Sequence, residues 1–521
     1  MPMKKTQENK FFSFSKNILN NEKNSVKQQR EGLLSIALVF PNSYAVGMSN
    51  LGFQTVYKLF NEFPGVSCER AFYYPYFPTV TKTLESNREL REFDVIAFSV
   101  SFEMDFINII QILINGGITP LSSNRDFREP LIIAGGAVTF LNPAPLTPFV
   151  DIFLIGELEP KLHTLMESLL NSKKQNLSKN EILESFNASP GFYVPAKFEN
   201  HQKVQKVHFH LKNENPQYSP ILSPDSHFKN MFLTEVGRGC GRKCNFCAAS
   251  FIYQPFRIFP VERILETIRT HCQETKRIGL IGSAISDYPK IKTLCLQLVK
   301  KNYQLGLSSF RLDKIDDSFI NILERGKVNS IAFAPEAGTE RLRKTINKNL
   351  SQEQIIDAAE VISHSSVNQV KLYFLIGLPG ETWEDIEGIV TLVDKMQQIF
   401  YRSKRTKKMT ISVNTFIPKP FTPFQWAAME KISEIQRKRK HLNKKLKALT
   451  GVQISPKSAK EEILQGIFSL GGKDIGKAIY FKIIDNLDWE QAWLKAGVNE
   501  QKILFSEKQS GEVFPWDFNE A

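Results

Sequence analysis

Residues 234–250 read T-E-V-G-R-G-C-G-R-K-C-N-F-C-A-A-S, and this stretch holds three of the chain's six cysteines. Cys240, Cys244 and Cys247 follow the spacing C-x3-C-x2-C, which lets one tight loop direct three thiolates to three corners of an iron–sulfur cube. Such cubes are normally held by four cysteine thiolates. A loop with three of them therefore leaves one iron without a protein ligand, and that iron is open to a reacting molecule.

A zinc knuckle is the alternative interpretation of these cysteines. Zinc requires four tetrahedral ligands, usually from two paired arms. No cysteine or histidine follows within fifteen residues of Cys247, and Cys68, Cys272 and Cys295 are scattered along the chain. The spacing therefore favours a cluster, and the neighbouring glycines would let backbone amides approach its sulfides closely.

The loop resembles the cluster motif of the radical S-adenosylmethionine (SAM) superfamily. In that superfamily the open iron binds the amino and carboxylate groups of SAM, and one electron splits the sulfonium to give a 5'-deoxyadenosyl radical. The resemblance implies a [4Fe-4S] cluster and SAM as cofactors, Phe246 beside them, and an electron donor such as a flavodoxin or ferredoxin. The protein's own task would be to place the radical beside a substrate C–H bond and to exclude solvent.

The length and composition indicate a globular chain of two or three domains. The chain has 521 residues, of which 42% are hydrophobic and 23% are charged, values typical of globular proteins. No apolar run reaches the eighteen residues of a membrane span. The N-terminus has no apolar signal region, and the cysteines have no paired framework. We therefore expect a cytoplasmic protein with no membrane partner.

The net charge of +13 is concentrated in two segments. Residues 1–30 carry +5 and predict a disordered basic arm, because they are rich in Lys, Asn, Ser and Gln. Residues 401–450 carry +12 and include a basic helix at 430–448. Nucleic acid is a conceivable partner for such a helix. A solvated helix is favoured, because no aromatic residues interleave with the charges.

Residues 31–170 alternate short apolar strands with amphipathic helices, which predicts a doubly wound parallel sheet of the Rossmann type. We expect strands at 34–40, 66–73, 95–101, 131–134 and 152–155, and helices at 51–63 and 106–114. Ligands bind such sheets at the carboxyl ends of the strands. The layout resembles the cobalamin-binding domain that precedes the radical domain in one branch of the superfamily.

The candidate cobalamin residues follow those strands. They are Asn42, Tyr44, Gly47, Ser99, Gly135 and Gly136. In cobalamin carriers of the His-ligating type, a histidine of the first loop ligates cobalt, but here no histidine precedes His163. Histidine ligation from this domain is therefore excluded by composition. Two alternatives stay open: cobalamin bound without that ligand, or a vestigial domain that serves as a lid.

The remaining chain divides into three parts. Residues 171–230 predict a polar linker and a small β-rich connector, in which His208 and His210 are interpreted as ordinary strand residues. Residues 231–428 repeat a strand–helix unit, which predicts an open (β/α)6 barrel carrying the radical chemistry. Residues 429–521 form a basic helical extension.

The barrel strands end in the residues that the resemblance implies for SAM. Gly282 and Ser283 take the place of the family's Gly-Gly-Glu near the SAM amino group, and Arg311 can meet the carboxylate through its forked donors. Glu336 is the candidate acceptor for the ribose hydroxyls. Gly377 and Gly380 permit a sharp turn close to the adenine. No catalytic side chain is assigned from the sequence.

The domain order resembles the B12-binding-type radical SAM proteins, whose scaffold supports many reactions. Methyl transfer to an unactivated carbon is the leading hypothesis if cobalamin binds, and another C–H modification of an unknown substrate otherwise. Methylthiolation of tRNA is disfavoured, because that branch carries a second cluster on three N-terminal cysteines and here only Cys68 precedes Cys240. The alternative function is a cluster- or corrinoid-binding sensor, or a nucleic-acid-binding protein, without SAM turnover.

Overall fold

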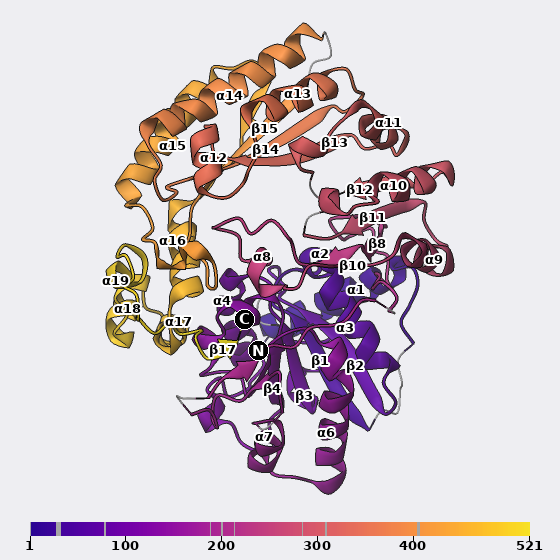
Figure 1. Cartoon of the computed structure of the whole chain (residues 1–521). Coiled ribbons are helices and arrows are strands. Elements are labelled where there is room, and N and C mark those ends of the chain that lie inside the picture. Colours follow the sequence, from indigo (N-terminus) through magenta and orange to yellow (C-terminus); the bar gives the residue numbers. More distant parts are fainter. Residues whose placement is uncertain are drawn as a thin grey trace.

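The computed structural model describes residues 2–27, 33–77, 80–187, 189–199, 202–212, 214–283, 285–307, 310–403 and 407–520. Figure 1 shows a first α/β part in indigo and purple, a second in magenta to orange, and C-terminal helices in yellow that run back beside the first part. None of the helices in these ranges combines the length and apolarity that a membrane crossing requires.

The first part is built on a six-stranded sheet in the order β2-β1-β3-β4-β5-β6. Its first five strands are parallel, and β6 runs antiparallel to β5. The order 2-1-3-4-5 is common among doubly wound sheets. The predicted strands are confirmed as β1 (Leu34–Phe40), β2 (Val66–Phe72), β3 (Val95–Ser99), β4 (Leu131–Gly135) and β5 (Ile152–Leu154), and β6 is Phe192–Tyr193.

Both faces of this sheet are buried, because alternate residues of each strand enter two different cores. Ile36 and Leu38 of β1 belong to the core on one face, whereas Ala37 and Val39 belong to the core on the other. The first core includes α3 (Leu51–Glu62), α6 (Leu162–Gln175) and α7 (Lys179–Asn187). The second core combines α4 (Phe106–Asn115) with the C-terminal helices α16 (Ala459–Leu470), α17 (Lys473–Ile484) and α18 (Trp489–Ala496). The C-terminal extension thus completes the first part.

The prediction of a disordered arm at residues 1–30 is wrong for its described residues. Helix α1 (Pro2–Asn21) packs its fully buried Phe11 against Tyr74, with ring centroids 4.7 Å apart. Beyond the helix, Glu22 accepts two hydrogen bonds from the buried guanidinium of Arg70, at 2.7 and 2.8 Å. A buried guanidinium requires charged partners, and the arm supplies one of them. Residues 28–30 lie outside the described residues.

The prediction of a polar linker after residue 170 is also wrong. The linker residues continue α6 and form α7, and Leu183 and Phe186 of α7 are buried in the first core. The connector that follows is poor in strands among its described residues. It contributes β7 (Val204–Gln205), which pairs with β17 (Asn519–Glu520) from the end of the chain. The rings of His208 and His210 lie 5.0 Å apart.

The second part holds two parallel sheets, ordered β12-β11-β8 and β13-β14-β15-β16. A parallel bridge between Phe310 and Phe333 links the end of the first sheet to β13. The strands follow one another in chain order across the two sheets, and β16 adds a seventh strand that the sequence did not indicate. They are β8 (Phe232–Glu235), β11 (Arg277–Ile281), β12 (Gln304–Leu307), β13 (Ser330–Glu336), β14 (Gln369–Ile376), β15 (Lys408–Thr415) and β16 (Val452–Ile454).

Helices follow the strands of the second part, and one apolar core lies between them. The longer ones are α9 (Val261–His271), α10 (Ile291–Lys300), α11 (Asp317–Arg325), α13 (Gln352–Ser363), α14 (Trp383–Arg402) and the basic α15 (Ile432–Lys447). The shorter elements are α2 (Tyr44–Gly47), α5 (Ala137–Leu141), α8 (Ala249–Ile252), α12 (Glu340–Thr345), α19 (Glu500–Leu504), β9 (Gly237–Arg238) and β10 (Arg257–Ile258).

Candidate active site around the cysteine loop

The three cysteines lie on the segment that leaves the carboxyl end of β8, here called the cluster loop (residues 237–247). Cys244 is buried, and Cys240 and Cys247 are half-buried. Gly239 has φ = +81°, and a Cβ there would lie 2.3 Å from the carbonyl oxygen of Tyr253, so the loop requires glycine at this point. Among the described residues, no three His, Cys, Asp or Glu side chains converge as the ligands of a single metal ion.

The cluster loop is held from outside by the turn that follows α12. The side chain of Asn347 donates a hydrogen bond to the carbonyl of Lys243 at 2.8 Å. Asn245 donates its backbone N–H to the carbonyl of Ile346 at 3.1 Å and its amide to that of Thr345 at 2.9 Å. Sequence reasoning missed both asparagines, because the contacts join residues about a hundred positions apart.

Burial weakens the acidity of two of the cysteine thiols, those of Cys244 and Cys247. Desolvation raises the pKa of Cys244 to about 11, and it also raises the pKa of Cys247. Lys348 acts in the opposite direction on Cys244. Because only thiolates bind metal, loading a cluster on this loop must release protons, and the charge of the iron must replace the lost solvation.

Glu336 lies at the end of β13 in a strained backbone conformation. Its φ is +70°, and the register between β13 and β14 shifts between Phe333 and Glu336. Its carboxylate lies 3.1 Å from the ammonium of Lys348. Burial raises the pKa of Glu336, and Lys348 opposes this shift. Left-handed backbone at a non-glycine residue is costly and clusters at functional sites, which supports the prediction that Glu336 contacts a ligand.

Arg311 is already engaged in an ion-pair network. Its guanidinium contacts Asp313 through Nε at 2.9 Å and lies 4.0 Å from Asp287. Asp287 in turn accepts a bidentate pair of hydrogen bonds from Arg242 of the cluster loop, at 2.5 and 2.8 Å. This network joins Arg311, which is predicted to bind the SAM carboxylate, to the cluster loop. In this structure the Arg311 guanidinium that would bind SAM contacts Asp313 instead.

Gly377 and Gly380 form the predicted sharp turn after β14, with φ of +78° and +77°. Gly377 donates a backbone hydrogen bond to the carboxylate of Glu381. A Cβ on Gly377 would lie 2.8 Å from Ile435 of α15. Glu381 is buried against Lys438 of the same helix at 2.7 Å. The structure therefore places Gly377 against the C-terminal extension, and its contact with adenine stays a prediction.

A cavity of about 540 Å³, here called the interdomain cavity, is lined by the first sheet and its helices and by residues of the second part. Of the predicted residues, Ser99, Gly135, Gly136, Gly282 and Ser283 line it. Its lining between α3, α6 and the first sheet is apolar, and its lining at the strand ends and the cluster loop, here called the mouth, is polar. The apolar part includes Leu38, Val56, Leu59, Phe60, Ile133, Leu154 and Leu165, and the mouth includes Asn50, Ser101, Gln217 and the start of the cluster loop at Gly237, Arg238 and Gly239.

The two adjacent glycines of this cavity differ in what they allow. A Cβ on Gly136, where φ is +116°, would lie 2.4 Å from the carbonyl oxygen of Val100, so the backbone itself requires glycine. A Cβ on Gly135 would meet its nearest neighbour, the Cβ of Leu154, at 3.8 Å. Gly135 therefore leaves open space towards the cavity that a larger side chain would fill.

Asn42, Tyr44 and Gly47 do not line the interdomain cavity. The hydroxyl of Tyr44 donates a hydrogen bond to Glu22 at 2.7 Å, and the Asn42 amide donates one to Asp105 at 2.8 Å. A Cβ on Gly47 would lie 2.5 Å from the ring of Phe72. The structure gives these three residues packing roles, and none of them joins Ser99 and Gly135.

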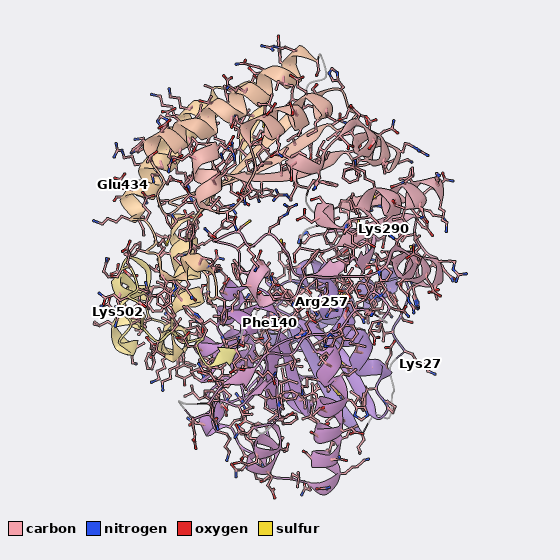
Figure 2. The ribbon with its side chains drawn as sticks, viewed as in Figure 1. Lys27, Phe140, Arg257, Lys290, Glu434 and Lys502 are labelled. Carbon is pink, nitrogen blue, oxygen red and sulfur yellow. The ribbon has the colours of Figure 1, made fainter. Side chains whose placement is uncertain are left out.

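An ion-pair network fastens the first part to the cluster loop at the cavity mouth. Arg238 contacts Glu159 at 2.5 Å, Glu235 at 3.0 Å and Glu157 at 3.1 Å. Glu157 also binds Arg257 at 2.8 Å. Phe140, which is labelled with Arg257 in Figure 2, lines the cavity and packs its ring against that of Tyr253, with centroids 5.6 Å apart. The acidic residues that follow the fifth strand thus dock the second part.

A second cavity of about 670 Å³, here called the barrel cavity, opens at the carboxyl ends of β13, β14 and β15. Phe246 and Glu336 line it together with aromatic and apolar residues and with α16 of the C-terminal extension. Lys419 at its wall pairs with Glu103 of the first part, and Glu462 pairs with Arg439 at 2.8 Å. The other lining residues are Phe102, Met104, Leu375, Asn414, Thr415, Phe416, Ile417, Lys457, Ser458, Glu461 and Gln465.

Comparison with known protein families assigns both parts. The model "Radical SAM proteins, N-terminal" matches residues 52–195, and the model "Radical SAM superfamily" matches residues 234–393, which include all three cysteines of the cluster loop. The chain belongs to the radical SAM superfamily. This radical SAM protein is an enzyme, and the cofactors of its family are a [4Fe-4S] cluster and SAM. Residues 394–521 lie beyond both models.

Individual proteins are similar to most or to part of the chain. The uncharacterized protein MJ0966 of Methanocaldococcus jannaschii is 29% identical over 447 residues, which cover 85% of this chain and 90% of the relative. The ribosomal protein uS12 methylthiotransferase RimO of Thermodesulfovibrio yellowstonii is 22% identical and is matched over 55% of its length and 41% of this chain.

Two solved structures share the fold. TsrM from Kitasatospora setae, a radical SAM methyltransferase solved with cobalamin and a [4Fe-4S] cluster bound, superposes with a TM-score of 0.52 at 12% identity, covering 75% of this chain and 74% of TsrM. OxsB, a cobalamin-dependent radical SAM enzyme solved with aqua-cobalamin, also has a TM-score of 0.52, at 13% identity over 86% of this chain and 66% of OxsB.

Proposed function

We propose that this enzyme cleaves SAM at a [4Fe-4S] cluster on Cys240, Cys244 and Cys247 and modifies a C–H bond of a substrate, with methyl transfer from cobalamin as the leading reaction. One observation carries the proposal. The cluster loop lies between two cavities: its start, at Gly237–Gly239, lines the interdomain cavity, and Phe246 near its end lines the barrel cavity. A radical formed at the loop therefore has a binding space on either side.

The cysteine loop fits a cluster with one open iron. Its thiols are buried or half-buried, its backbone passes close to its neighbours at Gly239, and the turn after α12 holds its shape from outside. The cluster and SAM together would supply the 5'-deoxyadenosyl radical. The remaining work belongs to the chain: it holds the thiolates, orients SAM and keeps water from the reacting carbon.

The residues nearest to the loop suit the functional groups of SAM. Glu336 carries a buried carboxylate at the wall of the barrel cavity, where it can accept hydrogen bonds from ribose hydroxyls. Phe246 offers a flat apolar face to the same space. Ser283 and Gly282 line the opposite cavity, so they would meet SAM only from the far side of the loop. Arg311 would reach the carboxylate by exchanging its contact with Asp313.

The interdomain cavity suits the nucleotide tail of cobalamin. A space with an apolar part and a polar mouth suits a ligand group that carries a flat aromatic base at one end. Gly135 leaves room there, and Ser99 and Ser101 offer hydroxyls at the strand ends. Cobalamin would supply a transferable methyl group. The first histidine of the chain is His163, whose side chain is 76% exposed and does not line this cavity, so residues 31–170 offer no histidine ligand there.

The barrel cavity is the proposed substrate site. Side chains of the second part, of Phe102 and Met104 in the first part, and of α16 line this cavity. Methylthiolation is not proposed, although RimO is among the relatives. Only Cys68 precedes the cluster loop, and its thiol is fully buried in β2, so the first part offers no second set of cluster ligands.

The test is anaerobic reconstitution with iron and sulfide, followed by assays of SAM cleavage and corrinoid retention. We expect 5'-deoxyadenosine from SAM and a reductant, and cobalamin that stays with the protein through gel filtration. Failure of a fully loaded cluster to cleave SAM would favour the sensor function.

Gly135→Leu isolates the cobalamin step, because the larger side chain fills the interdomain cavity away from the cysteines. We expect this variant to lose cobalamin while it keeps its iron and forms 5'-deoxyadenosine at the normal rate. Normal cobalamin retention by this variant would contradict the assignment of the cavity.

A further inference from the structure

The outer face of the cluster loop is exposed, and its exposed charges are positive. Gly241 and Lys243 are exposed and lie on either side of Arg242, and Lys243 directly precedes the buried Cys244. Lys344, on α12, is 68% exposed. The hydrogen bonds from Asn347 and Asn245 join the end of α12 and its following turn to the loop, so Lys344 lies on an element that contacts the loop directly.

The acidic partners of this surface lie beneath it. Arg341 is 52% exposed, whereas its partner Asp385 is 2% exposed. Arg242 is 37% exposed, whereas its partner Asp287 is 10% exposed. Each carboxylate therefore stabilises its arginine from the interior, and the guanidinium faces solvent. The third acidic partner differs from these two. Glu340 pairs with Lys344 at 2.8 Å, and its side chain is 36% exposed.

We propose that Arg242, Lys243, Arg341 and Lys344 form the docking surface for a small acidic electron-carrier protein that delivers one electron to the cluster. This inference rests on the proposed function, which requires a reductant. The carrier loses one electron and the cluster gains it, and no bond is formed or broken in the protein. The exposed backbone at residues 241–243 lies directly beside Cys244, so a carrier docked here is separated from the thiolate by a thin layer of protein.

Charge complementarity selects the partner. Exposed positive groups around a redox centre attract an acidic surface, increase the association rate and orient the encounter. Such an interface is small and weak, as electron-transfer contacts generally are. The basic helix α15 carries more charge, but it lies on the outer side of the second part, away from the cluster loop (Figure 1), and it serves as the control.

The experiment compares two double variants of the reconstituted enzyme for binding to a small acidic flavodoxin, measured by biolayer interferometry at low and high salt. Lys243→Asn with Lys344→Gln removes two charges of the surface. Asparagine tolerates the left-handed backbone at position 243, where φ is +54°. Lys444→Gln with Lys447→Gln removes two exposed charges of α15 as the matched control.

The surface variant should bind the flavodoxin roughly five- to tenfold more weakly at low salt, and the difference should disappear at high salt. The α15 control should bind as the unmodified enzyme does. Equal affinities of both variants and the unmodified enzyme would overturn the proposal, as would a surface variant that loses affinity for an RNA oligomer but not for the flavodoxin.

Reduction by dithionite separates this inference from the proposed function. With this small reductant, Lys344→Gln, which lies outside the cluster loop, should form 5'-deoxyadenosine at the unmodified rate. If the unmodified enzyme forms none, the proposed function fails. If Lys243→Asn lowers the iron content, the single variant Lys344→Gln tests the docking surface, because Lys344 lies outside the cluster loop. The flavodoxin affinity of this single variant should fall roughly threefold. An unchanged affinity would overturn the proposal.

Discussion

Replacing Arg238 by methionine tests how the first part is joined to the cluster loop. The substitution keeps a long unbranched side chain but removes the cation that contacts Glu157, Glu159 and Glu235 at 2.5–3.1 Å. Arg257 still balances Glu157. Glu159 loses its ion pair with Arg238, and all three carboxylates are largely buried. Breaking a buried pair from one side costs about 3–5 kcal/mol.

The network is partly solvated at the cavity mouth, so we expect the lower limit, about 3 kcal/mol in the free energy of unfolding. Urea unfolding followed by tryptophan fluorescence measures this loss, and cobalamin retention reports on the cavity. Arg263→Met is the control, because Arg263 and Glu266 are exposed and 3.7 Å apart, and it should change stability by less than about 0.5 kcal/mol. Equal stability of both variants would refute the reasoning.

Three further predictions concern the arm, SAM and acid. Glu22→Gln should lower the free energy of unfolding by about 3 kcal/mol, because it leaves the buried guanidinium of Arg70 with one fewer carboxylate; unchanged urea unfolding would show that the arm contributes nothing. Glu336→Gln should weaken SAM binding roughly 10- to 100-fold through a lost charge-assisted hydrogen bond, at normal iron content; unchanged SAM affinity in equilibrium dialysis would contradict the contact. Burial acts to raise the pKa of Glu157, but the guanidinium groups of Arg257 and Arg238 hold it below its ordinary value of 4.5. Because the pKa of Glu157 is lower in the folded state, the ionised carboxylate stabilises the fold at pH values above about 4.5. This stability is lost as the pH falls below about 4.5. Arg238→Met should therefore lose less stability over that acid range than the unmodified enzyme, and parallel curves of urea midpoint against pH would contradict this.

Local patterns were sufficient for most strands and helices of the first part. The apolar runs that became β1 and β3 are buried on both faces and can be read directly from the sequence. Helix α1 was missed because Lys and Asn dominate its composition, whereas its burial rests on a few residues such as Phe11 that need Tyr74 to pack against. The cover of the second face was equally hidden, because α16–α18 come from the far end of the chain.

The site was predictable where one motif carries it and not where distant residues meet. The cysteine spacing located the cluster loop, and the strand-end rule located Ser99 and Gly135. The same rule suggested Tyr44, but the direction of its loop depends on Glu22, which holds its hydroxyl. The clasp by Asn347 and the barrel-cavity wall on α16 arise from contacts between distant segments, and no local pattern indicates them.

The most direct test of the proposed cluster site is the iron and sulfide content of the anaerobically reconstituted protein, with its electron paramagnetic resonance spectrum after reduction. We predict about four irons and four sulfides per chain, a reduced-cluster signal that changes when SAM is added, and loss of both in Cys244→Ala. Protein without iron, or a Cys244→Ala variant whose spectrum matches that of the unmodified enzyme, would contradict it.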